Sequence, residues 1–194
     1  FMEVSSHAVV QHRITALEFA GAAFTNITHD HLDYHKTFDN YIKAKKGFFD
    51  NLPATAFALV NKDDKNGEVM LQNTRAIKKT YAINSMADFK CRIIENQFSG
   101  LLLTIDGKEF YSKLIGTFNA YNLLLAYSIG VLLKEDSTNV LTALSTLNAV
   151  EGRFQYLRSA NKITGIVDYA HTPDALKNVL TTINDIRTGN EKVI

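Results

Sequence analysis

Short apolar runs alternate with amphipathic segments along the first half of the chain. A segment whose apolar residues recur at helical spacing indicates a helix, whereas a short apolar run between polar turns indicates a buried strand. On this basis we expect strands at residues 1–5, 17–28 (apolar centre 19–24), 54–60 and 80–84, and helices at 37–50 and 68–78. Strands that alternate with helices predict a parallel sheet with covering helices.

The pattern changes in the middle of the chain. Three apolar runs follow one another without an intervening helix, at residues 88–98, 101–105 and 109–115. Asp106-Gly107 between the last two is a strong signal for a two-residue hairpin turn. We therefore expect a small antiparallel sheet next to the parallel one. Residues 116–122 are expected to open a strongly apolar helix that runs to about residue 133, with Asn119 as its N-cap. A second helix is expected at 137–148.

The short polar stretch at residues 159–162 predicts a domain boundary, with one domain at 1–160 and the beginning of another at 161–194. A strand at 163–167 should open the second domain. Thr172 and Pro173 are typical of the cap and first position of a helix. That helix has one apolar face and should end near Gly189.

Composition excludes several classes of protein. The chain has 194 residues, of which 46% are hydrophobic and 21% charged, and its net charge is +1. It is therefore expected to be globular, with no tendency to bind nucleic acid or an anionic membrane. A single cysteine, Cys91, rules out an internal disulfide and fits a reducing compartment. No apolar run approaches the roughly 20 residues of a membrane span.

A loop rich in histidine and aspartate follows the first long apolar run. Its possible ligand residues are His29, Asp30, His31, Asp33 and His35. Ligand sites of open α/β sheets form at the carboxyl ends of the strands, which is where this loop lies. A polar loop of this kind is often only solvated surface. Composition alone therefore does not decide between a metal site and a solvated loop.

The helix predicted after this loop carries an unusual lysine. Thr37 is a good N-cap, and the apolar face contains Phe38, Tyr41, Ile42, Phe48 and Phe49. Lys45 falls at the centre of that face. Burying an unpaired ammonium is costly, which favours a neutral and nucleophilic amine. The alternative is a lysine that extends its ammonium to water.

The residues 25–35, T-N-I-T-H-D-H-L-D-Y-H, followed by Y-I-K-A-K at 41–45, resemble the central-domain signature of the Mur ligases. These are the ATP-dependent amide-bond ligases of peptidoglycan synthesis. The resemblance implies that His31 binds magnesium and that Lys45 is carbamoylated by carbon dioxide. It also implies a fold with a mostly parallel sheet, covering helices and a small antiparallel sheet, followed by the start of a Rossmann-like C-terminal domain.

The first thirteen residues resemble one branch of that family, which adds the third residue of the stem peptide. The motif is E-V-S-S-H-x-x-x-Q-x-R. The resemblance implies that Glu3 binds magnesium and that Ser5, Gln11 and Arg13 hold the UDP-N-acetylmuramoyl-dipeptide. Without the family, Glu3 would be taken for a solvated acid.

Three later motifs resemble the family's ATP site. G-T-F-N-A-Y-N at residues 116–122 implies that Asn119 and Asn122 contact the adenine, although capping alone would explain Asn119. G-R-F implies that Arg153 reaches the ATP phosphates. D-Y-A-H-T-P resembles the start of the C-terminal domain and implies ribose contacts by Asp168 and an ATP contact by His171.

The implied reaction is the ATP-dependent addition of a diamino acid to UDP-MurNAc-L-Ala-D-Glu through an acyl phosphate, in the cytoplasm and with Mg²⁺. Meso-diaminopimelate is expected over lysine. The chain contains no G-x-x-x-x-G-K-[ST] phosphate loop, so we expect an internal fragment that is inactive alone. A related ligase that adds glutamate to folate, and a nucleotide-binding module without catalysis, are the alternatives.

Overall fold

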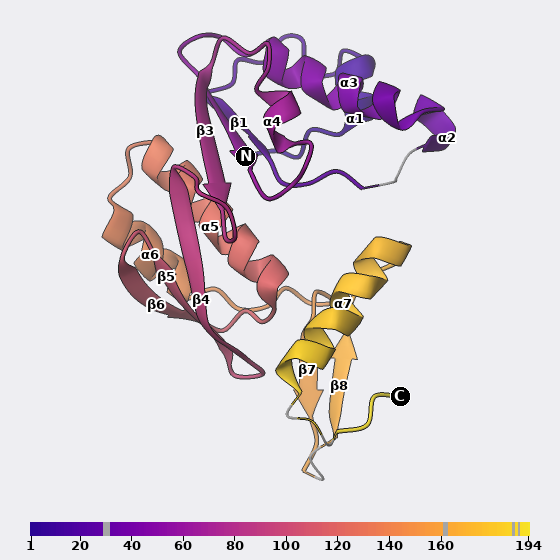
Figure 1. Cartoon of the computed structure of the whole chain (residues 1–194), viewed down its shortest axis with the longest axis vertical. Coiled ribbons are helices and arrows are strands. Elements are labelled where there is room, and N and C mark those ends of the chain that lie inside the picture. The colour runs from indigo at the N-terminus through magenta and orange to yellow at the C-terminus, as the bar shows by residue number, and fades with distance from the viewer. Residues whose placement is uncertain (29–31, 161–162, 188, 190) are drawn as a thin grey trace. The chain divides into compact units, whose positions relative to one another are not determined.

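The computed structural model describes residues 1–28, 32–160, 163–187, 189 and 191–194 (Figure 1). The chain folds into two compact units. The first comprises Phe1–Lys90 and Ser128–Lys134, and the second comprises Cys91–Tyr127 and Glu135–Ile194. None of the described helices is both long enough and apolar enough to cross a membrane.

The first unit is built on parallel strands. Strand β1 (Gly21–Phe24) pairs with β2 (Phe57–Asn61), β2 with β3 (Ile77–Ala82), and β3 with the first residues of β4 (Phe89–Gln97). Every residue of β2 is buried, as expected of a strand with neighbours on both sides and cover on both faces. The helices of this unit are α1 (Ser6–Val10), α2 (Leu32–His35), α3 (Phe38–Asp50) and α4 (Gly67–Met70) (Figure 1).

Helix α3 follows the sequence prediction closely. The Thr37 hydroxyl accepts a hydrogen bond from the Asn40 N–H at 3.2 Å and caps the helix. Tyr41 and Phe49 are buried in the core of the first unit, and the other apolar residues of the predicted face, Phe38, Ile42 and Phe48, pack against it. The predicted apolar face is therefore confirmed.

The second unit begins with antiparallel pairing. From Cys91 onward β4 pairs with β5 (Gly100–Ile105), and β5 pairs with β6 (Lys108–Ser112). Asp106 and Gly107 both have positive φ, 47° and 79°, which is the backbone that a two-residue turn of type I′ requires. The predicted hairpin is thus confirmed. Burial raises the pKa of the Cys91 thiol to about 12, in keeping with a packed strand residue.

The rest of the second unit contains α5 (Thr117–Leu132), α6 (Ser137–Ser145), β7 (Gln155–Arg158), β8 (Thr164–Val167) and α7 (Pro173–Ile186) (Figure 1). Helix α5 also extends into the first unit. Strands β7 and β8 pair antiparallel, so the predicted boundary at 159–162 falls in the connection between paired strands. The domain division at 160 stays a prediction. The predicted start of α7 is confirmed, because the Thr172 hydroxyl accepts from the Ala175 N–H at 3.3 Å.

Three local predictions are wrong. Residues 1–5 form no strand, and Ser5 instead caps α1. The helix expected at 68–78 shrinks to α4, and residues 77–79 belong to β3, because pairing along β2 outweighs local helix propensity. Asn119 is not the N-cap of α5, since the helix begins at Thr117.

Candidate functional site

A cavity of about 700 Å³ runs along β1 in the first unit. Its polar lining includes Glu3, Lys45 and the two residues that follow β1, Thr25 and Asn26. Parallel strands present ligand sites beyond their carboxyl ends, and the cavity reaches that position. The structure therefore brings together two of the three predicted metal-site residues, Glu3 and Lys45. The third, His31, lies outside the described residues.

Two neighbouring lysines of α3 have different surroundings. The Lys45 ammonium nitrogen lies 5.3 Å from the centroid of the Tyr41 ring, one helical turn earlier. Lys46 binds both carboxylate oxygens of Asp50, at 2.6 and 2.7 Å. Lys45 is half-buried and its side chain reaches the cavity. Its place on the apolar face was correctly predicted.

The described donors fit magnesium in type. Glu3 offers an exposed carboxylate within the cavity, and a carbamate on Lys45 would offer two further oxygens, which are the ligands that magnesium prefers. Among the residues that the structure describes, no three His, Cys, Asp or Glu side chains gather as a metal-binding group. Glu3 and a carbamate on Lys45 therefore suit magnesium by the type of their donor atoms and because both residues line the same cavity.

The predicted substrate residues lie on and after α1. The Ser5 hydroxyl accepts a hydrogen bond from the Ala8 N–H at 3.2 Å, which caps the helix. Gln11 ends the same helix, and Arg13 follows it with an exposed side chain. Ser5, Gln11 and Arg13 lie outside the described lining of the cavity.

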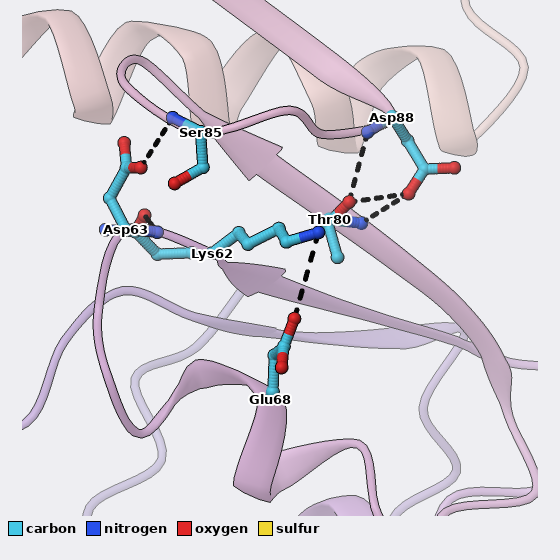
Figure 2. A network of polar contacts seen from close by, with 7 residues as sticks. Lys62, Asp63, Glu68, Thr80, Ser85 and Asp88 are labelled. Atoms are coloured by element: carbon cyan, nitrogen blue, oxygen red, sulfur yellow. Dashed lines mark hydrogen bonds and ion pairs between the residues drawn. The ribbon is translucent and has the colours of Figure 1, made fainter.

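The carboxyl edge of the parallel sheet is held by two aspartates that sequence analysis missed. Asp63 accepts hydrogen bonds from the N–H groups of three successive residues after β3, Ile83, Asn84 and Ser85, at 2.8–2.9 Å. Asp64 accepts from the Ile27 N–H at 3.2 Å and so ties the chain that leaves β1. Figure 2 shows Asp63 pointing to Ser85. The signal that could have found them is the polar turn at residues 61–67, since aspartates in turns often bind backbone N–H groups.

A third carboxylate stabilises the same region. Asp88, just before β4, accepts from both the N–H and the hydroxyl of Thr80, at 2.9 and 2.7 Å (Figure 2). It also accepts from Lys79 at 2.9 Å. Partial burial alone would raise the pKa of Asp88, but the hydrogen bonds from Thr80 and Lys79 outweigh burial and lower it. The lowered pKa keeps the Asp88 carboxylate ionised at neutral pH.

The predicted adenine residues lie in the first turns of α5. The Asn119 amide donates to the Ile115 carbonyl at 2.8 Å, and its oxygen accepts from the Asn122 amide at 3.3 Å. Asn119 therefore fastens the start of the helix, and Asn122 is exposed. The two asparagines thus contact each other, and their adenine contact stays a prediction.

The remaining ATP candidates converge at the ends of β7 and β8. Asp168 accepts hydrogen bonds from the Phe154 and Ala170 N–H groups, both at 2.7 Å. The Arg153 guanidinium lies 5.1 Å from the centroid of the Tyr169 ring. The Nδ1 atom of His171 lies 2.9 Å from the Tyr169 carbonyl oxygen. The structure thus brings Arg153, Asp168 and His171 into one neighbourhood within the second unit.

Known proteins resemble both parts of the chain. The family model of the Mur ligase middle domain matches residues 1–130, and that of the Mur ligase glutamate ligase domain matches residues 152–194. A UDP-N-acetylmuramoyl-L-alanyl-D-glutamate–2,6-diaminopimelate ligase from Cytophaga hutchinsonii is 60% identical over 98% of the chain, which spans 39% of that relative's length.

Solved structures agree with this likeness. The structure of a UDP-N-acetylmuramoyl-L-alanyl-D-glutamate–2,6-diaminopimelate ligase aligns with a TM-score of 0.79 and 29% identity, over 96% of this chain and 40% of that one. A MurF ligase from Thermotoga maritima in complex with ADP aligns with a TM-score of 0.74 and 16% identity, over 90% of this chain and 41% of that one. At that identity the second likeness concerns the fold alone.

Proposed function

Because the chain belongs to the Mur ligase family, we propose that it forms part of an ATP-dependent ligase that adds meso-diaminopimelate to UDP-MurNAc-L-Ala-D-Glu in peptidoglycan synthesis. The observation that carries this proposal is the high identity, across nearly the whole chain, to a relative named for that substrate and that diamino acid. We also propose that the reaction takes place in the cytoplasm. The chain is proposed to contain one domain at residues 1–160 and the beginning of another at 161–194.

The proposed reaction has two steps. An oxygen of the D-glutamate carboxylate attacks the γ-phosphorus of ATP, the bond from phosphorus to the bridging oxygen breaks, and ADP leaves. The amine of the diamino acid then attacks the acyl carbon, loses a proton and expels phosphate. Arg153 is proposed to offset the negative charge on the transferring phosphoryl group, since arginine pairs well with phosphate.

Lys45 is proposed to act as a carbamate. Its ammonium first releases a proton, and the nitrogen lone pair then attacks the carbon of carbon dioxide. Loss of a second proton leaves an N–C bond and an anionic carbamate. The carbamate oxygens, the Glu3 carboxylate and His31 would hold Mg²⁺, which supplies positive charge opposite the phosphates when bound. The shared cavity of Glu3 and Lys45 supports this assignment.

The other predicted residues are assigned to the two substrates. Ser5, Gln11 and Arg13 are proposed to bind the UDP-MurNAc-dipeptide, which fits the exposure of Gln11 and Arg13. The ATP is proposed to be held by four residues of the second unit, Asn119, Asn122, Asp168 and His171. The neighbourhood of Asp168 and His171 at the ends of β7 and β8 supports a shared ligand.

Chemical rescue of Lys45 in a full-length ligase that carries this sequence tests the proposal. Lys45→Ala should abolish formation of the UDP-MurNAc-tripeptide, and acetate should restore part of it because its oxygens replace those of the carbamate. Lys45→Arg should remain inactive, since a guanidinium stays charged and cannot take up carbon dioxide. Asp39→Ala, an exposed change on the same helix, is the control.

The same assay separates the alternatives. Full activity of Lys45→Arg would contradict the carbamate, because a positive charge alone would then suffice. Competition among diaminopimelate, lysine and glutamate for the wild-type enzyme identifies the amine that is added. A ligase that uses folate and glutamate, or a protein that binds ATP without releasing ADP, would refute the proposed reaction.

A further inference from the structure

The segment that leaves β1 is fixed on both sides of Asn26. The Phe24 carbonyl accepts a hydrogen bond from the Tyr81 hydroxyl at 3.3 Å. Three residues later, the Ile27 N–H donates to the Asp64 carboxylate at 3.2 Å. The side chains of Phe24 and Ile27 are both buried in the core of the first unit. Asn26, between them, is exposed and lines the cavity.

Asp64 is itself held in a tight turn. Its other carboxylate oxygen accepts from the Asn66 N–H at 2.8 Å, and its carbonyl accepts from the Gly67 N–H at 2.9 Å. Gly67 approaches the end of β2 so closely that a Cβ atom there would overlap the Asn61 carbonyl oxygen. The Asp64 carboxylate therefore has a fixed place relative to β2, the strand that pairs with β1.

The Asn26 amide suits a ligand group with two anionic oxygens. It offers two N–H donors, and as a neutral group it binds a carboxylate without adding charge to the cavity. Glu3 and Lys45 line the same cavity, whose remaining lining is mainly apolar. In a pocket of this kind a few fixed polar groups determine how the ligand is oriented.

We propose that Asn26 binds a carboxylate of the D-glutamate residue in the UDP-substrate, and that Asp64 is the positioning residue for Asn26. The identity of the ligand rests on the proposed function. Because the segment is already tied on both sides, binding orders little further chain. Val4, next to Ser5, also lines the cavity, so the proposed dipeptide-binding segment adjoins it.

Hydrogen exchange of the 194-residue chain tests the tie without any ligand. Asp64→Ala should raise the exchange rate of the Ile27 amide by about tenfold, since that N–H loses its acceptor. Asp63→Ala is the matched control, because the neighbouring carboxylate binds residues 83–85 and not Ile27. Equal exchange of the Ile27 amide in the two variants would overturn the positioning role of Asp64.

Calorimetric titrations of a full-length ligase that carries this sequence test the ligand. Asn26→Ala should weaken binding of UDP-MurNAc-L-Ala-D-Glu by about tenfold, because a hydrogen bond to a charged group is lost. Binding of UDP-MurNAc-L-Ala, which lacks the D-glutamate, should not change. Asn73→Ala, an exposed change in the same unit and outside the cavity lining, is the control. Equal weakening for the two ligands would refute the carboxylate contact.

A double variant separates positioning from stability. Asp64→Ala alone should weaken binding of UDP-MurNAc-L-Ala-D-Glu by about three- to tenfold, because the segment must then be ordered on binding. Asp64→Ala combined with Asn26→Ala should bind no more weakly than Asn26→Ala, since Asp64 acts through Asn26. Losses that multiply in the double variant would mean that Asp64 acts independently, and the positioning role would be wrong.

Tyr81→Phe replaces Asp64→Ala if that variant loses cooperative unfolding, since it removes the hydroxyl that binds the Phe24 carbonyl. The same comparison with Asn26→Ala then decides. A wild-type ligase that does not bind UDP-MurNAc-L-Ala-D-Glu would refute the proposed function. Wild-type binding together with unchanged affinity in Asn26→Ala would refute only the role of Asn26.

Discussion

Asp63 in the first unit and Asp168 in the second both follow a strand and both use two carboxylate oxygens to bind backbone N–H groups. The two aspartates differ in whether they are also candidate ligand-binding residues. In the first unit the candidate ligands, Glu3 and Lys45, are residues other than Asp63, whereas in the second unit Asp168 is itself a candidate ribose ligand. Structural and functional roles can therefore be separated by mutation in the first unit, but they coincide in one side chain in the second.

Asp168→Ala should have the largest effect, because it removes both roles at once. The Phe154 and Ala170 N–H groups lose their partner, and a ribose contact would be lost as well. In the full-length ligase we expect ATP binding to weaken more than binding of the UDP-substrate, in separate calorimetric titrations. Asp174→Ala, an exposed acid at the start of α7, is the control. Equal loss for the two ligands would reduce Asp168 to a structural residue.

Asp63→Ala should mainly lower stability. Three backbone N–H groups lose their acceptor, and we expect the free energy of unfolding to fall by roughly 2–3 kcal/mol in urea titrations of the 194-residue chain. Lys65→Ala, at an exposed position in the same turn, should change little. A full-length ligase with Asp63→Ala that stays folded yet cannot bind its substrates would break the comparison, since the two roles would then coincide there too.

The smallest effect is expected at Asp88, whose carboxylate is partly exposed. Its pKa is lower in the folded chain than its ordinary value of 3.8. Its contribution to stability is therefore present above that value and is lost as pH falls through the folded pKa. Acid titrations should show Asp88→Asn less stable than the wild type at pH 7, with the difference shrinking as pH falls below 3.8 and vanishing once pH is below the folded pKa. A constant difference at all pH values would exclude ionisation as its cause.

Local signals predicted the elements that local chemistry determines. Thr37 and the apolar face after it suffice for α3, and Asp106-Gly107 suffices for the hairpin of β5 and β6. Residues 77 and 78 were assigned to a helix because their partner strand, β2, lies some distance back in the sequence. A propensity read over a few residues cannot include that pairing.

The candidate site divides in the same way. The position of Lys45 on an apolar face follows from helical periodicity, and its contact with Tyr41 is an ordinary pair of residues four apart. The shared cavity of Lys45 and Glu3 could be expected only from the family resemblance. The ties made by Asp63 and Asp64 were missed because their partners are backbone groups of other loops, which side-chain types do not reveal.

The single cysteine, Cys91, can report the local opening of strand β4. Cys91 lies in β4, the strand in which parallel pairing gives way to antiparallel pairing. With its pKa raised to about 12, the buried thiol has almost no thiolate at neutral pH. Each excursion that exposes β4 returns the thiol to ordinary acidity. The alkylation rate of Cys91 therefore measures how often β4 separates from its neighbouring strands.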